Sequence, residues 1–309
     1  MNITNLLINL QNKSVAAFSS TAHHIERIQE ALPGCSITVA EGKTEFLARL
    51  PEAECVLAWS FRPEWYELAP KLKAVFTPAA GHDWVAEDPT GRVQTFYGSF
   101  HGRIMRESLL SMMLYFNRRI GASVEDQKQG VWGRDDYSSC VGLFSQQVLI
   151  IGCGALGQSM AALLKAFGAR ITGVRRTVPE EIPACIDSMI SFERLEEELP
   201  NADHLVLLLP GEKETDGIIT RHHFAAMKPG ALLYNLGRGN CYQEDDLLAA
   251  LKNGPLAGAG LDVFAHEPLP AASPLWEQPN VLITPHSSAV SREYIDLFIQ
   301  EWLERLRAL

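Results

Sequence analysis

The stretch QVLIIGCGALGQSMAALLKAFG, residues 147–168, decides the fold class. It opens with an apolar, β-branched run of the kind that builds a buried parallel strand. Gly152, Gly154 and Gly157 then complete the pattern GxGxxG, and the rest has helical periodicity and closes on Gly168, a residue suited to ending a helix. A glycine-rich turn between a buried strand and a helix predicts a dinucleotide-binding βαβ unit.

Each part of this turn has a distinct expected role. Gly152 permits the tight turn, Gly154 lets a pyrophosphate approach the main chain, and Gly157 lets helix and strand pack closely. The amides around Ala155 and Leu156 lie at the start of the helix, where unpaired N–H groups and the helix dipole favour an anion. We therefore expect the phosphates of a dinucleotide to bind here.

The next strand, ARITGV, should end where the adenosine ribose of the cofactor lies. An acid at that place would favour NAD, but the sequence has Arg175, eighteen residues after Gly157, followed by Arg176 and Thr177. Arginine cannot accept hydrogen bonds from the ribose hydroxyls, whereas it can pair with a 2′-phosphate. We predict a preference for NADP over NAD. The alternative is that both arginines point into water and the preference is weak.

Apolar runs alternate with helical stretches along the whole chain. Residues 103–120 are apolar at helical spacing, and the polar, Gly- and Ser-punctuated residues 121–142 read as a linker or excursion. Strands separated by helices predict the α/β class with doubly wound parallel sheets. Strands are expected within residues 54–60, 73–81, 202–210, 231–237, 257–264 and 280–286.

The C-terminal stretch places Ile295, Phe298, Trp302 and Leu306 on one helical face. Because the crossovers of the nucleotide-binding sheet are already accounted for, we assign this helix to the first domain. The prediction is of two Rossmann-like doubly wound parallel-sheet domains, one inserted into the other. They are a flavodoxin-like substrate domain, residues 1–102 and 288–309, and a dinucleotide-binding domain, residues 103–287.

Composition excludes several classes of protein. Of the 309 residues, 47% are hydrophobic and 21% charged, as in ordinary globular chains. The formal net charge of -10 and the lack of a long basic run argue against nucleic acid or an anionic membrane as the main partner. We recognise no signal peptide and no apolar run long enough to span a membrane. Six scattered cysteines without a CxxC pair fit a reducing cytoplasm.

Three polar side chains follow later strands of the nucleotide-binding domain. Arg238 stands in NLGRG, Glu267 lies five residues after Asp262 in LDVFAHEPLP, and His286 ends ITPH. Ligands of open α/β sheets bind at the carboxyl ends of the strands. We therefore expect Arg238, Glu267 and His286 to converge beside the nicotinamide.

The motifs around these residues resemble those of the D-isomer-specific 2-hydroxyacid dehydrogenase family, and the residue types suit the reaction that this resemblance implies, the reduction of a 2-keto acid. Arg238 can hold the carboxylate and polarise the keto oxygen with its planar guanidinium. His286 can act as general acid toward the oxygen that becomes the alcohol. Glu267 would hydrogen-bond the imidazole, favour its protonated form and fix its orientation. The hydride comes from the cofactor.

The chain resembles the D-isomer-specific 2-hydroxyacid dehydrogenase family. The motifs GCGALG, LLLPGEKETDGII, LYNLGRG, DDLLAALKNG, GLDVFAHEPLPAASPLW and VLITPH follow that family's order and spacing over residues 148–287. The stretches MRESLL and LKAVFTPAAGHDWV match more loosely. Within the family the chain is most similar to the NADPH-linked glyoxylate/hydroxypyruvate reductases, which also replace the strand-end acid with a basic stretch.

The resemblance implies a reaction, a site and partners. The reaction is NADPH-dependent reduction of a small 2-keto acid, of the glyoxylate or hydroxypyruvate type, to the D-2-hydroxy acid by a homodimer joined through the nucleotide domain. Asp262 would hold the nicotinamide carboxamide, the amides near Ala80 and Gly81 would bind the substrate carboxylate, and Trp59 would line the pocket. Further cofactor contacts are expected from Pro210, Leu236 and Gly237.

Some residues depart from the family's motifs. Met105 and Arg106 stand in MRE where VAE is common, and Ser-Ser-Ala follows His286. These departures leave the shape and charge of the substrate pocket open. Arg62 would suit a second acidic group on a substrate.

Two other functions were weighed on the same fold. A dinucleotide-sensing, corepressor-like binding protein is the main alternative. A formate- or phosphite-type oxidation is disfavoured by Glu267, because formate enzymes of this architecture have an amide there. The adjacent pairs His23–His24 and His222–His223 diverge by about 100° on a helix, so they form no metal site and are predicted to be surface residues.

Overall fold

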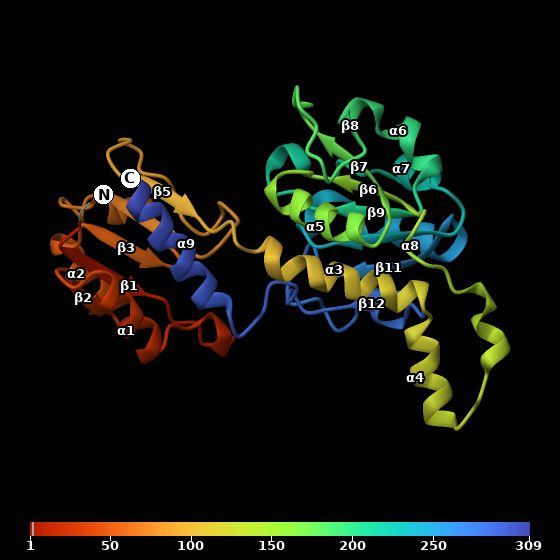
Figure 1. Cartoon of the computed structure of the whole chain (residues 1–309), viewed down its shortest axis with the longest axis horizontal. Helices are drawn as coiled ribbons and strands as arrows, with labels where there is room; N and C mark the ends of the chain where they lie inside the picture. Colours follow the sequence, from red (N-terminus) through yellow and green to blue (C-terminus); the bar gives the residue numbers. More distant parts are fainter. Residues whose placement is uncertain (2) are drawn as a thin grey trace. The chain divides into compact units, whose positions relative to one another are not determined.

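The computed structural model describes Met1 and residues 3–309, with Asp136 represented by its main chain alone. These residues divide into two compact units (Figure 1). Unit 1 comprises Met1–His101 and Val290–Leu309, and unit 2 comprises Gly102–Ala289. Unit 2 is thus inserted into unit 1. The sequence predicted the inserted domain to span residues 103–287, and in the structure it spans Gly102–Ala289.

Unit 1 contains, among the described residues, a five-stranded parallel sheet with the order β2-β1-β3-β4-β5. The strands are β1 (Asn5–Asn9), β2 (Ser36–Val39), β3 (Cys55–Ala58), β4 (Ala74–Thr77) and β5 (Gln94–Tyr97). β3 and β4 are buried along their whole length, as expected of central strands covered on both faces. The order is the predicted flavodoxin-like one, in which the direction of winding changes between β1 and β3.

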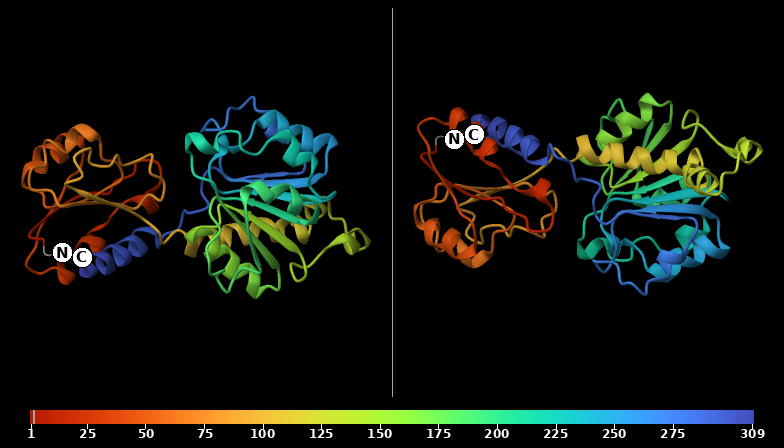
Figure 2. Two further views of the ribbon diagram at one scale, coloured as in Figure 1. Left: turned by 90° about the horizontal axis from the view of Figure 1, so that it is seen from above. Right: turned by 90° about the horizontal axis from the view of Figure 1, so that it is seen from below.

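Helices cover both faces of this sheet (Figure 2). They are α1 (Ala22–Ala31) and α9 (Tyr294–Ala308) on one face and α2 (Lys43–Arg49) on the other. Ile295, Phe298, Trp302 and Leu306 of α9 are all buried. The apolar stripe read from the sequence is therefore the face that α9 packs on the sheet of unit 1.

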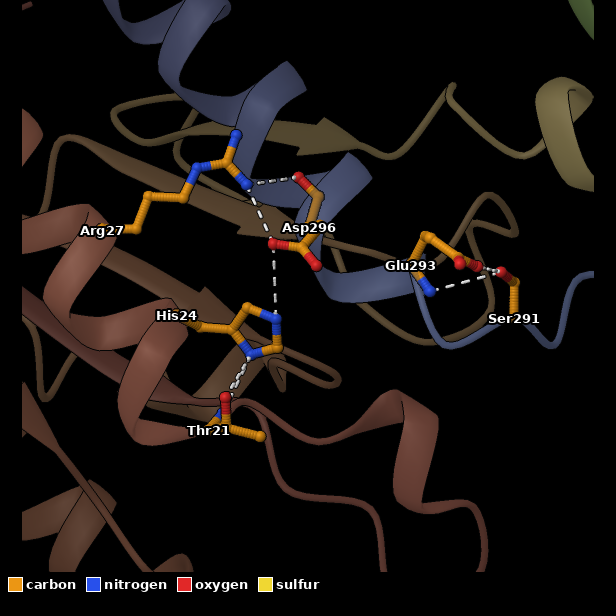
Figure 3. Close-up of polar contacts among 6 residues, drawn as sticks. All are labelled: Thr21, His24, Arg27, Ser291, Glu293 and Asp296. Carbon is orange, nitrogen blue, oxygen red and sulfur yellow. Dashed lines mark hydrogen bonds and ion pairs between the residues drawn. The ribbon is translucent and has the colours of Figure 1, made fainter.

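A polar cluster joins α1 to α9 (Figure 3). Arg27 Nη1 donates to Asp296 Oδ1 over 2.9 Å, and His24 Nε2 lies 3.6 Å from the same oxygen. On its other side, His24 Nδ1 accepts a hydrogen bond of 3.0 Å from the amide of Thr21. The last helix is thus tied to the first by charge as well as by apolar packing.

Unit 2 contains, in the part of the chain that the structure describes, a seven-stranded parallel sheet ordered β12-β11-β10-β9-β6-β7-β8. Its strands are β6 (Gln147–Ile151), β7 (Arg170–Arg175), β8 (Ser188–Ser191), β9 (His204–Leu207), β10 (Ala231–Asn235), β11 (Leu256–Leu261) and β12 (Val281–Ile283). From β6 the sheet grows one way through β7 and β8 and the other way through β9 to β12. The unit is therefore doubly wound, as predicted, with its switch point between β6 and β9.

Helices lie on both faces of this second sheet (Figure 2). They are α3 (Gly102–Asn117), α5 (Ala155–Ala166), α6 (Leu195–Glu198), α7 (Arg221–Ala225) and α8 (Glu244–Asn253). One core holds Leu109 of α3 and Leu164 of α5, and the other holds Leu195, Phe224 and Leu247 of α6, α7 and α8. Among the described residues, no helix is long and apolar enough to cross a membrane.

Residues 121–142, predicted to be a linker or excursion, begin with a helix that the sequence did not reveal. Ile120–Gln129 form helix α4, which begins after Arg119 at φ +53° and ends at Gly130 at φ +67°. None of its residues is buried, and the helix projects from the body of unit 2 (Figure 1). The helix adjoins α3, and the hydroxyl of Tyr137 donates a 2.8 Å hydrogen bond to Ser123 in it. A helix that buries none of its residues needs no core-facing apolar stripe, so the sequence lacks the periodicity that would have predicted it.

Two histidines that the sequence analysis placed on the surface have a structural role instead. His24 is 7% exposed, and the side chain of His223 is 14% exposed. In each, Nδ1 accepts a 3.0 Å hydrogen bond from the amide of a threonine three residues earlier, Thr21 or Thr220. Each completes a capping box at a helix start, where Glu or Gln is commoner. The described residues contain no group of three or more His, Cys, Asp or Glu placed to hold a metal ion.

The six cysteines are free thiols, and Cys35, Cys55, Cys153 and Cys241 are buried. Burial raises the pKa of the Cys153 thiol to about 11 and that of Cys241 to about 12. Both therefore stay protonated near neutral pH and pack as small apolar residues.

Candidate active site

The glycine-rich turn lies at the switch point of the unit 2 sheet, between β6 and α5. Gly152 has φ +88°, and a Cβ atom there would lie 2.7 Å from the carbonyl oxygen of Leu208, just after the neighbouring strand β9. The amide of Gly152 donates to the carbonyl oxygen of Val174 on β7 over 3.1 Å. This position requires glycine for reasons internal to the chain, as expected of the tight turn.

Gly157 and Gly154 differ in what surrounds them. A Cβ atom at Gly157 would lie 3.1 Å from the oxygen of Gly152 and 3.3 Å from the side chain of Ile150, so glycine lets α5 pack closely on β6. A Cβ atom at Gly154 would meet no described atom within 4 Å. The fold itself thus does not demand glycine at residue 154, whereas the close approach of a diphosphate to the main chain does.

The start of α5 also fits a phosphate. Ala155 and Leu156 are its first two residues, and amides of a first helical turn have no acceptor within the helix. None of the described residues of that turn is acidic, so no carboxylate of the helix repels an anion there. The unpaired amides and the positive end of the helix dipole favour a negatively charged group. Turn and helix together fit the diphosphate of a dinucleotide.

Two arginines follow the glycine-rich turn along the carboxyl edge of the sheet. β7, the neighbour of β6, ends in Arg175, and Arg176 and Thr177 come next. Arg175 is half-buried and acts electrostatically on Cys153 of the turn, while Arg176 is exposed. Neither arginine forms an ion pair with another described residue. Two cations without a carboxylate partner beside an anion-binding turn can pair with a further phosphate.

Arg238 follows β10 in a turn that Asn235 shapes from within. The buried side chain of Asn235 accepts a 3.1 Å hydrogen bond from the amide of Gly237 and donates one of 3.1 Å to the carbonyl oxygen of Arg238. Leu236 is buried between them, and Pro210 stands beyond the end of the adjacent strand β9. The half-buried Arg238 is therefore presented from a fixed main chain.

Asp262 holds the loop that carries His286. Its fully buried carboxylate accepts hydrogen bonds from the Thr284 hydroxyl at 2.5 Å and from the amides of Ser287 and Ser288 at 2.8 and 3.0 Å. Its main-chain oxygen accepts one of 2.8 Å from the amide of His286. The described side-chain contacts of Asp262 are thus with this loop, and its contact with a nicotinamide carboxamide stays a prediction.

His286 and Glu267 form a hydrogen-bonded pair. Nδ1 of His286 lies 2.7 Å from Oε2 of Glu267, whose other oxygen accepts a 3.0 Å hydrogen bond from the amide of Phe264. Because a carboxylate accepts, Nδ1 carries a hydrogen and Nε2 is the nitrogen that can exchange a proton with a ligand. The His286 side chain is 47% exposed, and its φ of +49° is uncommon for a residue other than glycine. The ring is oriented on one side and accessible to solvent.

The predicted catalytic side chains stand at one edge of the unit 2 sheet. Arg238 follows β10, Glu267 lies in the loop after β11, and His286 follows β12, and these three strands are neighbours. Side chains after parallel strands share the carboxyl edge of the sheet. A cation suited to a carboxylate or a carbonyl oxygen thus shares an edge with an oriented histidine, a set that can protonate an oxygen beside a bound acid.

Unit 1 carries the other predicted residues at the carboxyl edge of its own sheet. Trp59 directly follows β3, and its indole Nε1 donates a 2.9 Å hydrogen bond to the carbonyl oxygen of Phe18. Ala80 and Gly81 lie in the loop after β4, Ala80 exposed and Gly81 half-buried. Their amides can serve a ligand that reaches this loop.

The residues that depart from the family's motifs lie in different settings. Met105 is 7% exposed and packs in the core of unit 2, so it alters the charge of no pocket. Arg106 is half-buried, and its Nε is buried without a hydrogen-bond partner among the described residues. Arg62 is exposed, with Nη1 3.9 Å from Glu64 and its guanidinium carbon 5.9 Å from the ring centre of Trp65. The use of Arg62 by a substrate stays a prediction.

Known proteins are similar to this chain over most of unit 2, which carries these residues. Residues 110–288 match the family model of the D-isomer specific 2-hydroxyacid dehydrogenase, NAD binding domain. The chain belongs to the D-isomer specific 2-hydroxyacid dehydrogenase family. Glyoxylate/hydroxypyruvate reductase A of Serratia proteamaculans is 35% identical over 257 residues, which cover 77% of this chain and 78% of that protein. The predicted family is confirmed, and its members are oxidoreductases.

Two solved members of the family have the same fold over nearly the whole chain. One is the NADPH-dependent glyoxylate/hydroxypyruvate reductase from Sinorhizobium meliloti, in complex with NADP and sulfate, at TM-score 0.79 and 28% identity, covering 99% of this chain and 95% of that one. The other is a D-isomer specific 2-hydroxyacid dehydrogenase from Xanthobacter autotrophicus Py2, in complex with NADPH and MES, at TM-score 0.80 and 28% identity, covering 99% and 96%. The predicted fold of two parallel-sheet α/β domains is confirmed.

For this family member, the sequence analysis missed the residues that shape the site from within. Asn235 is a polar residue that ends an otherwise apolar strand, and Thr284 directly follows another. A polar side chain at the end of a buried strand must find hydrogen-bond partners, and this was the signal available. Which partners it finds, Gly237 and Arg238 or Asp262, depends on the turn geometry that only the structure gives.

Proposed function

We propose that this 2-hydroxyacid dehydrogenase family member reduces a small 2-keto acid, of the glyoxylate or hydroxypyruvate type, to the D-2-hydroxy acid with NADPH. The observation that carries the proposal is the 2.7 Å pair of His286 and Glu267 at the sheet edge that also holds Arg238. A family member that only sensed dinucleotides would need neither an oriented proton donor nor a cation beside it.

His286 is the proposed general acid. Glu267 accepts the Nδ1 hydrogen, which orients the ring and leaves Nε2 to deliver a proton to the keto oxygen. Arg238 binds the carboxylate and the keto oxygen, so that negative charge developing on that oxygen is stabilised. The cofactor, when bound, supplies the hydride.

In unit 1 the amides of Ala80 and Gly81 are proposed to bind the substrate carboxylate, and Trp59 to line the pocket. The support is their place in loops at the carboxyl edge of a parallel sheet, where open α/β domains bind ligands. A loop that presents amides without a bulky side chain suits a small acid better than a large one.

The preferred cofactor is proposed to be NADP. Support comes from Arg175, which ends β7, and Arg176, which follows it, since neither has a carboxylate partner among the described residues. A relative of the same family binds NADP in its solved structure. The diphosphate is assigned to the turn of Gly152, Gly154 and Gly157 with the amides of Ala155 and Leu156, and Thr177 is placed beside the adenosine ribose.

The nicotinamide half of the cofactor is assigned to residues that follow the later strands of unit 2. Pro210 follows β9, Leu236 and Gly237 follow β10, and Asp262 follows β11. Asp262 is also proposed to orient the loop of His286, since its carboxylate accepts the amides of Ser287 and Ser288.

The functional form is proposed to be a homodimer joined through unit 2. Large apolar side chains are exposed on and around α4, and Trp132 in the segment after it is 92% exposed. Projecting apolar side chains of this kind are typical of an interaction surface. The others are Ile120, Val124, Val131 and Val141. Sedimentation of the wild type and of Trp132→Ser tests this, with a smaller fraction of dimer expected for the variant.

The compartment proposed is the cytoplasm, in keeping with six free thiols.

The function is tested by following NADPH oxidation with glyoxylate, hydroxypyruvate, pyruvate and phenylpyruvate, and by repeating the series with NADH. We expect turnover with the small 2-keto acids and a lower KM for NADPH than for NADH. A folded protein that binds NADPH and turns over none of these acids would contradict the proposal and favour a sensing role.

A further inference from the structure

The chain passes between the two units after His101 and again before Val290. His101 is the last residue of the first segment of unit 1, and Tyr294 opens helix α9 in the second segment. Both side chains are buried, with 6% and 3% exposure, and both belong to unit 1. They bring together two parts of the chain that are 193 residues apart.

The hydroxyl of Tyr294 links this pair to the loop after β4. It lies 2.8 Å from His101 Nε2 and donates a 3.1 Å hydrogen bond to the carbonyl oxygen of Pro78. A carbonyl oxygen only accepts, so the tyrosine uses its one hydrogen there, and Nε2 of His101 must donate to the tyrosine oxygen. Burial raises the pKa of Tyr294 well above its ordinary value, which keeps this hydrogen in place.

Aromatic rings fix the position of that hydroxyl. The ring of Tyr294 stacks on Trp59 at 5.8 Å between centroids and contacts Phe18 at 4.5 Å and Phe100 at 4.8 Å. Trp59 in turn donates its indole hydrogen to the carbonyl oxygen of Phe18. The tyrosine therefore has little freedom to move its oxygen away from Pro78.

Gly98 lies against the Pro78 carbonyl and holds the carbonyl of the next residue, Ala79. A Cβ atom at Gly98 would lie 2.4 Å from the oxygen of Pro78, and the amide of Gly98 donates a 3.0 Å hydrogen bond to the oxygen of Ala79. The two residues that follow, Ala80 and Gly81, are the proposed carboxylate binders. The tyrosine hydroxyl thus fixes the Pro78–Ala79 peptide, and Gly98 fixes the next one, which carries the Ala80 amide.

We propose that His101 and Tyr294 are a positioning pair that fixes the carbonyl of Pro78 and, through it, the substrate-binding amides of Ala80 and Gly81. This inference rests on the proposed function, because it presumes that those amides bind the substrate carboxylate. Neither side chain touches the substrate. The pair acts by holding the loop at the point where the chain leaves unit 1.

The test is Tyr294→Phe, which keeps the ring packing and removes the hydroxyl. We expect KM for the 2-keto acid to rise about three- to tenfold, the effect of one neutral hydrogen bond. KM for NADPH is expected to stay within about twofold, because the hydroxyl bears on a substrate loop and not on the cofactor turn. Hydrogen exchange of peptides covering residues 78–85 is expected to be faster than in the wild type.

His101 provides a second and independent variant. His101→Leu removes the donor and is expected to match Tyr294→Phe in KM and in loop exchange. His101→Gln retains an N–H donor and is expected to restore both toward the wild type. A purely structural role would lower the melting temperature of all three variants without this order in KM.

Tyr234→Phe is the matched control. Tyr234 is also a buried tyrosine whose hydroxyl pairs with a histidine, 3.2 Å from His204 Nδ1, but it lies in the core of unit 2. We expect this variant to leave the KM for the 2-keto acid and the exchange of residues 78–85 unchanged. Hydrogen exchange needs no turnover. A wild type inactive on every 2-keto acid would refute the proposed function, and the exchange of residues 78–85 would still test whether His101 and Tyr294 position the loop. Unchanged loop exchange and unchanged KM in both Tyr294→Phe and His101→Leu would overturn the coupling itself.

Discussion

The main-chain oxygen of Asp262 accepts a 2.8 Å hydrogen bond from the amide of His286, and the same residue's carboxylate accepts the amides of Ser287 and Ser288. One buried aspartate thereby stabilises a loop in which His286 adopts the left-handed φ of +49°. A non-glycine residue in that conformation is unfavourable by itself and persists only when its surroundings hold it. The orientation of the proposed general acid thus depends on a residue that need not touch the reacting atoms.

Replacement of Asp262 tests this dependence. In Asp262→Asn, one oxygen becomes an NH₂ group that cannot accept a main-chain amide, so the loop loses part of its support. We expect the free energy of unfolding to fall by about 2 kcal/mol, and kcat to fall because His286 is no longer fixed. Urea unfolding and steady-state kinetics measure the two effects.

Asp187→Asn is the control for that experiment. The Asp187 carboxylate also accepts a main-chain amide, that of Ile171 at 2.8 Å, but Asp187 directly precedes β8 and pairs with the start of β7, away from the carboxyl edge of the sheet. It is expected to lower stability and leave kcat unchanged. Equal kcat values for Asp262→Asn and the wild type would show that the loop needs no such support.

Arg175 and Arg176 are predicted to select the cofactor. Replacing both with glutamine removes the two cations assigned to the 2′-phosphate, and each charge-assisted hydrogen bond lost should weaken NADPH binding about 10- to 150-fold. NADH lacks the phosphate, so its KM should change little. Arg170→Gln, at the opposite end of the same strand β7, is the matched control. Equal changes in KM for NADPH and NADH in the double variant would show that the two arginines do not select the cofactor.

Gly152 and Gly154 should respond differently to the same substitution. Gly152→Ala places a Cβ 2.7 Å from Leu208 at a positive φ, and we expect it to destabilise the fold by about 1–3 kcal/mol. Gly154→Ala meets no described atom, so its melting temperature should stay near that of the wild type, while NADPH binding weakens about tenfold or more. Calorimetry and fluorescence titration separate the two. Wild-type NADPH affinity in Gly154→Ala would show that the diphosphate does not bind at this turn.

The stability of unit 2 should depend on pH through His204. The ring is buried, Nε2 lies 2.8 Å from the side-chain oxygen of Gln146, and burial lowers the pKa of His204 from 6.5 to about 4. Between these values the unfolded chain binds a proton that the folded chain does not, so stability falls as the pH drops from 6.5 to about 4. The loss reaches about 3 kcal/mol below that range.

Chemical denaturation of the wild type and His204→Asn across this range checks that expectation. The variant should be less stable at pH 7 but should lose less stability on acidification, and the exposed His23→Asn controls for the loss of a histidine as such. Parallel pH profiles for the wild type and His204→Asn would exclude His204 as the cause.

The sequence predicts most strongly those features that repeat along the chain or that a fixed spacing defines. Strands buried on both faces appear in the sequence as apolar runs, so the strand ends that carry Arg238 and His286 could be predicted. The turn between β6 and α5 needs glycine at a fixed place, so Gly152 could be predicted too. The doubly wound topology of each sheet follows from the alternation of strands and helices.

What the sequence did not reveal depends on single contacts or on missing partners. Helix α4 buries none of its residues and so lacks a periodic apolar pattern. His24 and His223 cap helices. Each stands next to an exposed histidine in the sequence, so the adjacent pair gave no sign that one member is buried. The contacts of Asn235 join it to residues only two and three positions away, but they depend on a turn conformation that residue identities alone do not specify.

His286 is proposed to protonate the substrate, and one comparison tests this role most directly. The rate of NADPH oxidation with glyoxylate and with hydroxypyruvate is measured for the wild type and for His286→Gln, with NADPH affinity measured in parallel by fluorescence. We expect turnover by the wild type, a loss of about 10²- to 10⁴-fold in the variant, and unchanged affinity for NADPH. Turnover by His286→Gln at the wild-type rate would contradict it.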